Sequence, residues 1–582
     1  MQAKHLGFVA LASVLMLGAV YAQDSFGITD YPPITEDQLV NPAPGDWPMY
    51  RRTYDGQGYS PLDQINKDNV AQLVPAWSYS TGVVEGHESP PVVVNGVMFV
   101  TTPEHHVFAL NAATGQLYWK YTADITENTN PSHPTNRGVA VLGDKVFYAA
   151  HDATLVALDA KTGEEVWSTE VANVDEAYYM TLAPLVADGK VLIGVSGGEY
   201  GIRGFVAAYD AETGEEAWKT YTIPAPDEPG GDTWPAGAYV TGAGSTWSTG
   251  NYDPESKLVY WGVGNAGPWM GDQRPGDNLY TASTIALDVE TGEIKGHFQY
   301  SHNESFDWDE VTAPILVDLP NKDGETVKGL VNPTRSGILW ALERTSEGPI
   351  NFIWGEKYVP GDVITDIDAE TGRVSYDESK KPSTGTTKTY CPSVHGGRDW
   401  PSTAYSPDTG LLYIPANANM CTELTGAEVE YEAGQPFIGF DSLEFQVTDD
   451  AEYIGSVQAW DVATGEMKWE HKFPRSGNWG PILATGGGLI FSGGTNDRMF
   501  RAYDAENGDV LWEQKLNSGV IGTPSTFEVD GKQYVAVQAG YGVDAVFNNT
   551  VIAEHFGISS DVPQGGVVWV FEVKDGAVAS AE

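Results

Sequence analysis

The chain has 582 residues, of which 80 are acidic and 32 basic, giving a net charge of −48. Hydrophobic residues make up 41% of it and aromatic residues 11%, with 66 glycines and 18 tryptophans. This is the composition of a folded protein. The acidic excess excludes nucleic-acid binding, which needs a basic surface. It leaves open a surface adapted to salty surroundings or one that steers a basic partner protein.

The first residues predict export from the cytoplasm. Lys4 precedes an apolar run from Leu6 to Val20, and the small Ala22 follows. This order is typical of a secretory signal peptide over residues 1–22, cleaved near Ala22. The alternative is a membrane anchor, but the run is shorter than the ~20 residues that span a bilayer. No later stretch is long and apolar enough for stable membrane insertion.

One pattern recurs along the chain: a short apolar strand, an Asp, a Thr-Gly turn and a Trp. It is clearest at residues 107–119, 155–167, 206–218, 457–469 and 500–512, weaker at 284–296 and degenerate at 339–348. The turn glycine tolerates positive φ between two strands, and we expect each Trp to pack one repeat against the next. Repeats of about 40–50 residues built from strands are typical of propeller blades.

These repeats predict an all-β fold, and the length of the chain fits an eight-bladed β-propeller with tryptophan-docking repeats better than six blades. Residues 23–582 would then form a single domain, with most insertions between about 220 and 450. Propellers place function at one face of the central axis. Because many propellers are only scaffolds, function has to be inferred from residues that break the repeat.

Four stretches break the repeat with polar side chains among glycines and aromatics: 197–204, 262–269, 306–310 and 333–337. Glu199, Asn265, Asp307 and Asp309 offer hard oxygen ligands of the kind that Ca²⁺ prefers. Asp307 and Asp309 would point to the same face of a strand, where their charges repel unless a cation lies between them. The alternative for each acid is an ordinary place on the surface.

Cysteine use is sparse. Cys391 and Cys421 are the only two cysteines, and in an exported protein an isolated pair is most simply a disulfide. There is no CxxCH motif, which excludes a covalently attached c-type haem.

Several long segments resemble the quinoprotein alcohol dehydrogenases, the family that depends on pyrroloquinoline quinone (PQQ). They are residues 46–66, 276–283, 391–417 and 483–493, and the resemblance covers essentially the whole mature chain. It implies an eight-bladed propeller in the periplasm, with PQQ and a metal ion on the axis.

The resemblance also implies roles for individual residues. Asp307 matches the proposed general base, and Arg335 matches an arginine that hydrogen-bonds the quinone. The implied metal ligands are Glu199, Asn265, Asp307 and Asp309, and the implied cofactor contacts are Glu88, Arg137, Thr181, Ser245, Trp247, Arg335 and Asp399. Asp399 stands where the family often has Asn, which puts that contact in doubt because a carboxylate cannot donate. Cys391 and Cys421 match a family disulfide.

Asp309 bears on the choice of metal. Calcium-dependent members of the family usually have a small residue there, whereas lanthanide-dependent members have Asp. A trivalent ion gains more than Ca²⁺ from an extra carboxylate, so the resemblance favours a lanthanide over Ca²⁺. The alternative is that Asp309 turns into solvent or pairs with a neighbour.

The chain departs from the family before Arg137. The family's alcohol dehydrogenases usually carry adjacent cysteines there, whereas this chain has Pro131 and Ser132. His133 would then cover the cofactor or act as a second base, or it is simply exposed.

The function that the resemblance implies is oxidation of a small, primary alcohol to the aldehyde, with a soluble cytochrome c as electron acceptor. Two alternatives stay open: a dehydrogenase for sugars or polyols, and a non-catalytic propeller scaffold. The oligomeric state is also open, with a homodimer as one option.

Overall fold

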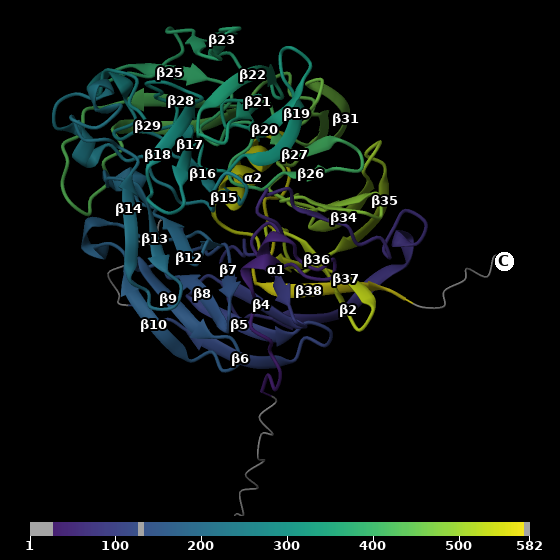
Figure 1. Cartoon of the computed structure of the whole chain (residues 1–582). Coiled ribbons are helices and arrows are strands. Elements are labelled where there is room, and N and C mark those ends of the chain that lie inside the picture. Colours follow the sequence, from purple (N-terminus) through teal and green to yellow (C-terminus); the bar gives the residue numbers. More distant parts are fainter. Residues whose placement is uncertain (1–26, 126–132, 575–582) are drawn as a thin grey trace, which may run out of the picture.

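The computed structural model describes residues 27–125 and 133–574 (Figure 1). The expected signal peptide, Pro131 and Ser132 lie outside these residues. The chain folds as an all-β propeller, with its sheets arranged around a centre that contains the one long helix of the described residues, α2 (Val543–Phe556).

Five sheets of the described part of the chain each consist of four consecutive antiparallel strands. In chain order they are β3 (Val92–Val94), β4 (Val97–Thr102), β5 (His106–Asn111) and β6 (Leu117–Thr122); β7 (Val139–Leu142), β8 (Lys145–Ala149), β9 (Thr154–Asp159) and β10 (Glu165–Glu170); β11 (Leu185–Ala187), β12 (Lys190–Gly194), β13 (Phe205–Asp210) and β14 (Glu216–Tyr221); β15 (Asn251–Asp253), β16 (Leu258–Val263), β17 (Ser283–Asp288) and β18 (Ile294–Gln299); β19 (Ile315–Pro320), β20 (Thr326–Pro333), β21 (Ile338–Arg344) and β22 (Ile350–Lys357).

Three further sheets of the described residues contain the same four-stranded unit with changes. They are β26 (Ala404–Ser406), β27 (Leu411–Asn417), β30 (Gly455–Asp461) and β31 (Glu466–Phe473); β32 (Leu483–Thr485), β33 (Leu489–Ser492), β34 (Met499–Asp504) and β35 (Val510–Lys515), extended by β1 (Tyr59–Ser60); and β36 (Ser525–Val529), β37 (Lys532–Ala539) and β38 (Val567–Val573) with β2 (Leu73–Ser80). In the last sheet, β2 from near the start of the chain pairs antiparallel with β38 from its end.

Two small sheets are insertions within the range where the repeat pattern breaks down. They are β23 (Ile364–Ile367) with β24 (Val374–Tyr376), and β25 (Thr387–Tyr390) with β28 (Met420–Gly426) and β29 (Phe440–Val447). The remaining helical elements are α1 (Glu36–Val40) and the 3-10 turns η1 (Val70–Gln72), η2 (Val174–Glu176), η3 (Gly198–Tyr200), η4 (Gly231–Thr233), η5 (Ala238–Thr241) and η6 (Gly271–Gln273).

The repeat motif forms the turn between the third and fourth strands of a sheet. After β13, Asp210 accepts the N–H groups of Glu212 and Thr213 at 3.0 and 2.9 Å, and Gly214 adopts φ +73°. Only a residue without Cβ fits there, because a Cβ would lie 2.6 Å from the ring of Trp167. The tryptophan of one repeat therefore packs on the turn of the next, as the sequence predicts.

The segment around Asp307 is not a strand. Residues 306–309 have no regular structure, and Asp307 itself has a left-handed φ of +60°. The prediction that Asp307 and Asp309 lie on one face of a strand is therefore wrong. An irregular segment with a left-handed residue carries both carboxylates instead.

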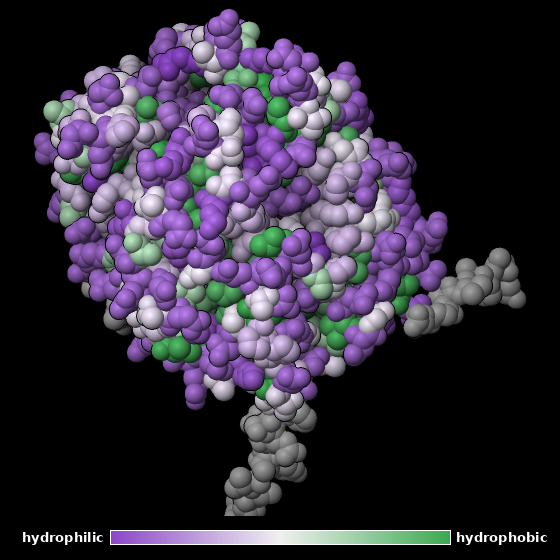
Figure 2. Space-filling view, viewed as in Figure 1, coloured by the Kyte–Doolittle hydropathy of each residue, from purple (hydrophilic) through white to green (hydrophobic). Residues whose placement is uncertain are grey.

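The face shown in Figure 2 is mostly hydrophilic, with small hydrophobic groups scattered over it. Among the described residues, none of the helices has the length and hydropathy needed to cross a membrane.

Candidate functional site

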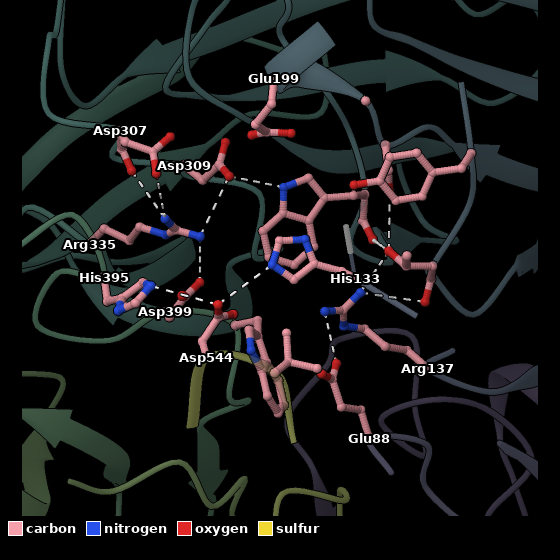
Figure 3. A pocket seen from close by; sticks show the side chains of 17 residues that line it. Glu88, His133, Arg137, Glu199, Asp307, Asp309, Arg335, His395, Asp399 and Asp544 are labelled. Carbon is pink, nitrogen blue, oxygen red and sulfur yellow. Dashed lines mark hydrogen bonds and ion pairs between the residues drawn. The ribbon is translucent and has the colours of Figure 1, made fainter. Parts of the chain in front are cut away.

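A cavity of about 100 Å³ collects most of the residues singled out in the sequence (Figure 3). Its lining includes nine of the predicted cofactor and metal residues, namely Glu88, Arg137, Thr181, Glu199, Trp247, Asp307, Asp309, Arg335 and Asp399. The remaining two, Ser245 and Asn265, lie behind this lining.

The sheet topology explains why distant residues meet. Most of the nine lie in segments that lead into the first strand of a sheet, as Arg137 does before β7 and Trp247 before β15. Glu199 and Arg335 lie instead between the second and third strands of a sheet. In an antiparallel sheet these two connections lie at the same end, so the residues converge on one face.

Three carboxylates form a cluster at one side of the cavity. Oxygens of Glu199, Asp307 and Asp309 lie within 4.8 Å of one another. Burial raises the pKa of Glu199, and the charge of Asp309 adds to the shift. Burial and Asp309 likewise raise the pKa of Asp307 well above its usual range. Glu199 and Asp307 are thus hard to ionise next to Asp309, which is the electrostatic situation that a bound cation relieves.

Asp309 faces this cluster and is 7% exposed. Its Oδ1 accepts the backbone N–H of Asn265 at 2.7 Å, and its Oδ2 accepts the indole N–H of Trp247 at 3.0 Å. The Oδ1 atoms of Asn265 and Asp307 are both buried without a hydrogen-bond partner. Three carboxylates and one amide, among which two oxygens have unused lone pairs, form a donor set suited to a hard cation.

Ser245 supports the cluster from behind. It is buried, and its carbonyl accepts the backbone N–H of Gly264 at 2.7 Å, next to Asn265. The structure thus places Ser245 and Asn265 against the lining and not at the cavity surface.

Arg335 lies between the carboxylate cluster and a second acidic group. It forms an ion pair with Asp399, and it lies 3.5 Å from Asp309 Oδ2 and 3.8 Å from Asp307 Oδ2. Burial alone would lower its pKa, but Asp399 and Asp309 outweigh burial and raise it. Its Nε is buried without a partner. A permanently charged donor is therefore held at the centre of the site.

A second arginine lies between aromatic rings. The Arg137 guanidinium is 4.7 Å from the ring centre of Trp247 and 5.5 Å from that of Trp400. It pairs with Glu88 at 2.8 Å and donates to Thr181 Oγ1 at 2.8 Å. Burial raises the pKa of Glu88 to about 7, and Arg137 opposes that shift.

Sequence reasoning missed Asp544, His395 and Trp400, which also line the cavity. Asp544 lies in the first turn of α2, and its Oδ1 is 3.7 Å from His395 Nε2 and 3.5 Å from His133 Nε2. Asp544 is hard to single out from the sequence, because α2 belongs to no repeat. His133 lines the cavity with 42% of its side chain exposed, and its role as a cover stays a prediction.

The predicted disulfide is present. Cys391 and Cys421 are bonded, with 30 residues of sequence separation, and no cysteine of the chain remains free. The bond ties the segment after β25 to β28.

The residues present fit a flat, acceptor-rich ligand and a cation. The Nε atoms of Arg137 and Arg335 are buried donors without partners, and the ring of Trp247 offers a planar surface beside them. PQQ is a planar quinone with three carboxyl groups, which match two arginine donors and an aromatic face. The carboxylate cluster provides hard ligands for a metal at one side.

Comparison with known proteins gives a consistent result. A family model described as "Glucose/ethanol/alcohol dehydrogenase, beta-propeller domain" matches residues 47–372 and 471–535. The quinoprotein alcohol dehydrogenase PedH of Pseudomonas putida is 35% identical over 97% of this chain and 96% of its own length. Subunit 1 of the methanol dehydrogenase [cytochrome c] of Paracoccus denitrificans is 35% identical, with 93% of this chain and 89% of that protein covered.

A solved structure has the same fold. A europium-containing methanol dehydrogenase superposes with a TM-score of 0.86 at 35% identity, covering 92% of this chain and all of that one. The family match spans more than half of this chain, and the relatives align over almost all of it. The chain belongs to the family of PQQ-dependent quinoprotein alcohol dehydrogenases.

Proposed function

We propose that this protein oxidises a primary alcohol to the aldehyde in the periplasm, using PQQ and a lanthanide ion. The observation that carries the proposal is the cluster of Glu199, Asp307 and Asp309, whose oxygens lie within 4.8 Å of one another beside Arg335. A scaffold has no need for mutually repelling carboxylates that face a cavity.

The site residues divide into two groups, according to whether they would hold the cofactor or the metal. Glu88, Arg137, Thr181, Trp247 and Arg335 would hold the cofactor, with Asp399 fixing Arg335 and Ser245 supporting the wall. Glu199, Asn265, Asp307 and Asp309 would hold the metal. When bound, the quinone supplies a hydride acceptor and the metal supplies Lewis acidity.

Asp307 is the group that we assign to proton removal. Its Oδ1 has no hydrogen-bond partner, and its Oδ2 lies 3.8 Å from Arg335. A carboxylate with a free oxygen at a cavity wall can accept the hydroxyl proton of a bound alcohol. Arg335 donates to negative charge that develops beside it, and its ion pair with Asp399 keeps it in place.

Asp309 is the reason for proposing a lanthanide and not Ca²⁺. It brings the cluster to three carboxylates, and its side chain is directed at the cluster by two hydrogen bonds. A trivalent ion gains more from that third charge than a divalent ion does. The europium named in the similar solved structure supports the same choice.

The remaining parts of the proposal concern the whole molecule. We assign the eight sheets that contain a four-stranded unit to eight blades, and residues 1–22 to the signal peptide. The acceptor is a soluble cytochrome c, for which the relative named methanol dehydrogenase [cytochrome c] and the net charge of −48 give support.

A polar substrate is the second candidate, and the surroundings of Asp544 favour it. Its carboxylate lines the cavity, and its contacts with His133 and His395 are 3.5 Å or longer, so it can still accept a donor from a ligand. A second hydroxyl of a diol or sugar is such a donor. Comparing kcat/KM for ethanol with that for glycerol separates the two candidates.

The decisive experiment is alcohol oxidation with an artificial dye as acceptor, by the PQQ-loaded protein, with La³⁺ or Ca²⁺ supplied in parallel. We expect activity with La³⁺ that far exceeds activity with Ca²⁺. Asp309→Ala should reduce the La³⁺-dependent kcat/KM by about 10–100-fold, since it removes one ligand and the partner of the Trp247 N–H. Equal activity of the variant with both metals is also expected.

Two results would contradict the proposal in different ways. If the wild-type protein is active with Ca²⁺ but not with La³⁺, the lanthanide assignment is wrong and the dehydrogenase assignment stands. A protein that binds PQQ and a metal but oxidises no alcohol or sugar would remove the dehydrogenase.

A further inference from the structure

The loop that carries Asp307 and Asp309 holds an unfavourable backbone conformation. It connects β18 to β19, and Asp307 has φ +60°. A left-handed conformation is disfavoured for a residue with a Cβ, although Asp adopts it more readily than most other residues do. The conformation persists only if the surrounding structure fixes it, which raises the question of which contacts do so.

Glu304 makes those contacts. Its Oε2 accepts the backbone N–H of Phe306 at 2.8 Å and that of Trp308 at 3.3 Å. These are the residues immediately before and after Asp307, so one carboxylate oxygen binds the backbone N–H groups of both of its neighbours. Glu304 is 1% exposed and does not line the cavity.

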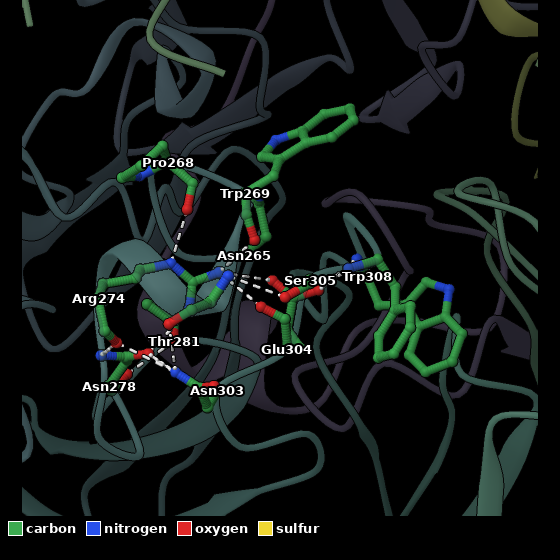
Figure 4. Close-up of polar contacts among 12 residues, drawn as sticks. Asn265, Pro268, Trp269, Arg274, Asn278, Thr281, Asn303, Glu304, Ser305 and Trp308 are labelled. Carbon is green, nitrogen blue, oxygen red and sulfur yellow. Dashed lines mark hydrogen bonds and ion pairs between the residues drawn. The ribbon is translucent and has the colours of Figure 1, made fainter. Parts of the chain in front are cut away.

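Arg274 neutralises Glu304 and ties it to a second stretch of the site (Figure 4). Its Nη2 lies 3.6 Å from Glu304 Oε1 and donates to the carbonyls of Glu304 and Trp269 at 2.6 and 2.9 Å. Its Nε donates to the Pro268 carbonyl at 2.7 Å. Pro268 and Trp269 follow Asn265 closely in the chain.

Further hydrogen bonds complete the connection. Arg274 Nη1 donates to Asn278 Oδ1 at 2.8 Å, and the Asn303 side-chain amide donates to the Arg274 carbonyl at 3.0 Å. The Ser305 hydroxyl accepts the backbone N–H of Gly271 at 2.8 Å. The stretch around Asn265 and the loop of Asp307 and Asp309 are therefore fixed to each other at several points.

We propose that Glu304 and Arg274 form a positioning pair that holds Asp307 and Asp309 opposite Asn265 before a metal ion binds. The proposal rests on the proposed function, because it presumes that these residues are metal ligands. Neither side chain of the pair would be a ligand of the ion, since neither lines the cavity. Each acts through the backbone, and the gain is a site that needs little rearrangement when the ion enters.

The binding affinity for La³⁺ tests this directly, since it needs no turnover. Calorimetric titration of the full mature chain, loaded with PQQ, gives Kd for the wild type, Glu304→Ala and Glu304→Gln. We expect Glu304→Ala to weaken binding by about 10–100-fold. Glu304→Gln keeps an acceptor oxygen but loses the charge, so a smaller loss of about 3–10-fold is expected.

Asp55 provides a matched control. Its Oδ1 accepts the backbone N–H of Gln57 at 3.1 Å and the hydroxyl of Thr53 at 2.6 Å, and it does not line the cavity. Asp55→Ala and Asp55→Asn lose a carboxylate that holds loop backbone in the same way. We expect both to bind La³⁺ within about twofold of the wild type, because a general loss of stability is not what sets the affinity.

The outcomes are distinguishable. A folded Glu304→Ala protein with wild-type affinity would overturn the pairing, as would an equal loss in the Asp55 variants. If Glu304→Ala does not fold, wild-type affinity in Glu304→Gln overturns it. A wild-type protein that binds no La³⁺ would instead remove the metal site of the proposed function, and the positioning role with it.

Discussion

The two ends of strand β13 place the same chemical group in opposite surroundings. Asp210 ends the strand at the outer turn, where two backbone N–H groups bind its exposed carboxylate. The Thr213 N–H contributes most to lowering the pKa of Asp210. Glu199 precedes the strand at the cavity end, where burial and Asp309 raise its pKa. A carboxylate is thus a structural group at one end and a candidate ligand at the other.

This difference shows how to recognise functional acids in a chain that has 80 of them. An acid that serves the fold has backbone partners and ionises easily. An acid that awaits a ligand is buried, keeps an oxygen without a hydrogen-bond partner and stands near others of its kind, as Asp307 does. Three predictions test this contrast, from the largest expected effect to the smallest.

Removing an acid at the cavity end should abolish activity and keep the fold. Asp307→Ala removes the assigned base, so kcat/KM should fall by about 10³-fold or more. Dye-linked turnover of the PQQ- and La³⁺-loaded protein measures this, with circular dichroism as the check on folding. If the variant keeps more than about a tenth of the wild-type rate, Asp307 is not the base.

The buried acids at the cavity end should also make the cofactor-free protein less stable as pH rises. The pKa of Glu88 is raised from 4.5 to about 7. Protonation of buried Glu88 therefore contributes its full amount to the free energy of unfolding below about pH 4.5. This contribution is lost as the pH rises to about 7. The shift corresponds to about 3 kcal/mol. Denaturant unfolding between pH 4.5 and 7.5 measures it.

Glu88→Gln is the comparison for the pH experiment, because it cannot ionise. Its free energy of unfolding should fall less steeply over the same range, although Glu199 and Asp307 keep part of the slope. If the free energy of unfolding of the variant changes with pH as steeply as that of the wild type, burial does not raise the pKa of Glu88.

Removing an acid at the turn end should change stability only slightly and activity not at all. Asp210→Ala leaves the N–H groups of Glu212 and Thr213 to water, at a cost of about 1 kcal/mol. Thermal unfolding and dye-linked turnover measure the two quantities. A large loss of activity would show that the two ends of the strand are coupled.

Much of the fold could be predicted because the repeat is local. Asp210, Gly214 and the tryptophans carry the turn within a dozen residues, so a pattern in the sequence maps directly onto a shape. The cavity residues that the family resemblance implied also lie together in the structure. The direction of the Asp307 and Asp309 side chains was harder, since it depends on a left-handed turn that Glu304 holds from within the core.

Asp544 and His395 could not be predicted for a different reason. They come from α2 and from the segment after β25, which share no repeat and no spacing with the other site residues. Only the arrangement of the sheets around a common centre brings them to within 3.7 Å of each other. Sites assembled from unique segments leave no periodic trace in one sequence.

The pairing of β2 with β38 fixes an order of events. The sheet that contains Leu73 cannot be completed until Val573 has been made. A growing chain that has not yet reached residue 544 therefore lacks both this sheet and Asp544. The cavity gains its full lining only after the segment that carries α2 has been made, although the first of its lining residues, Glu88, is made long before that segment.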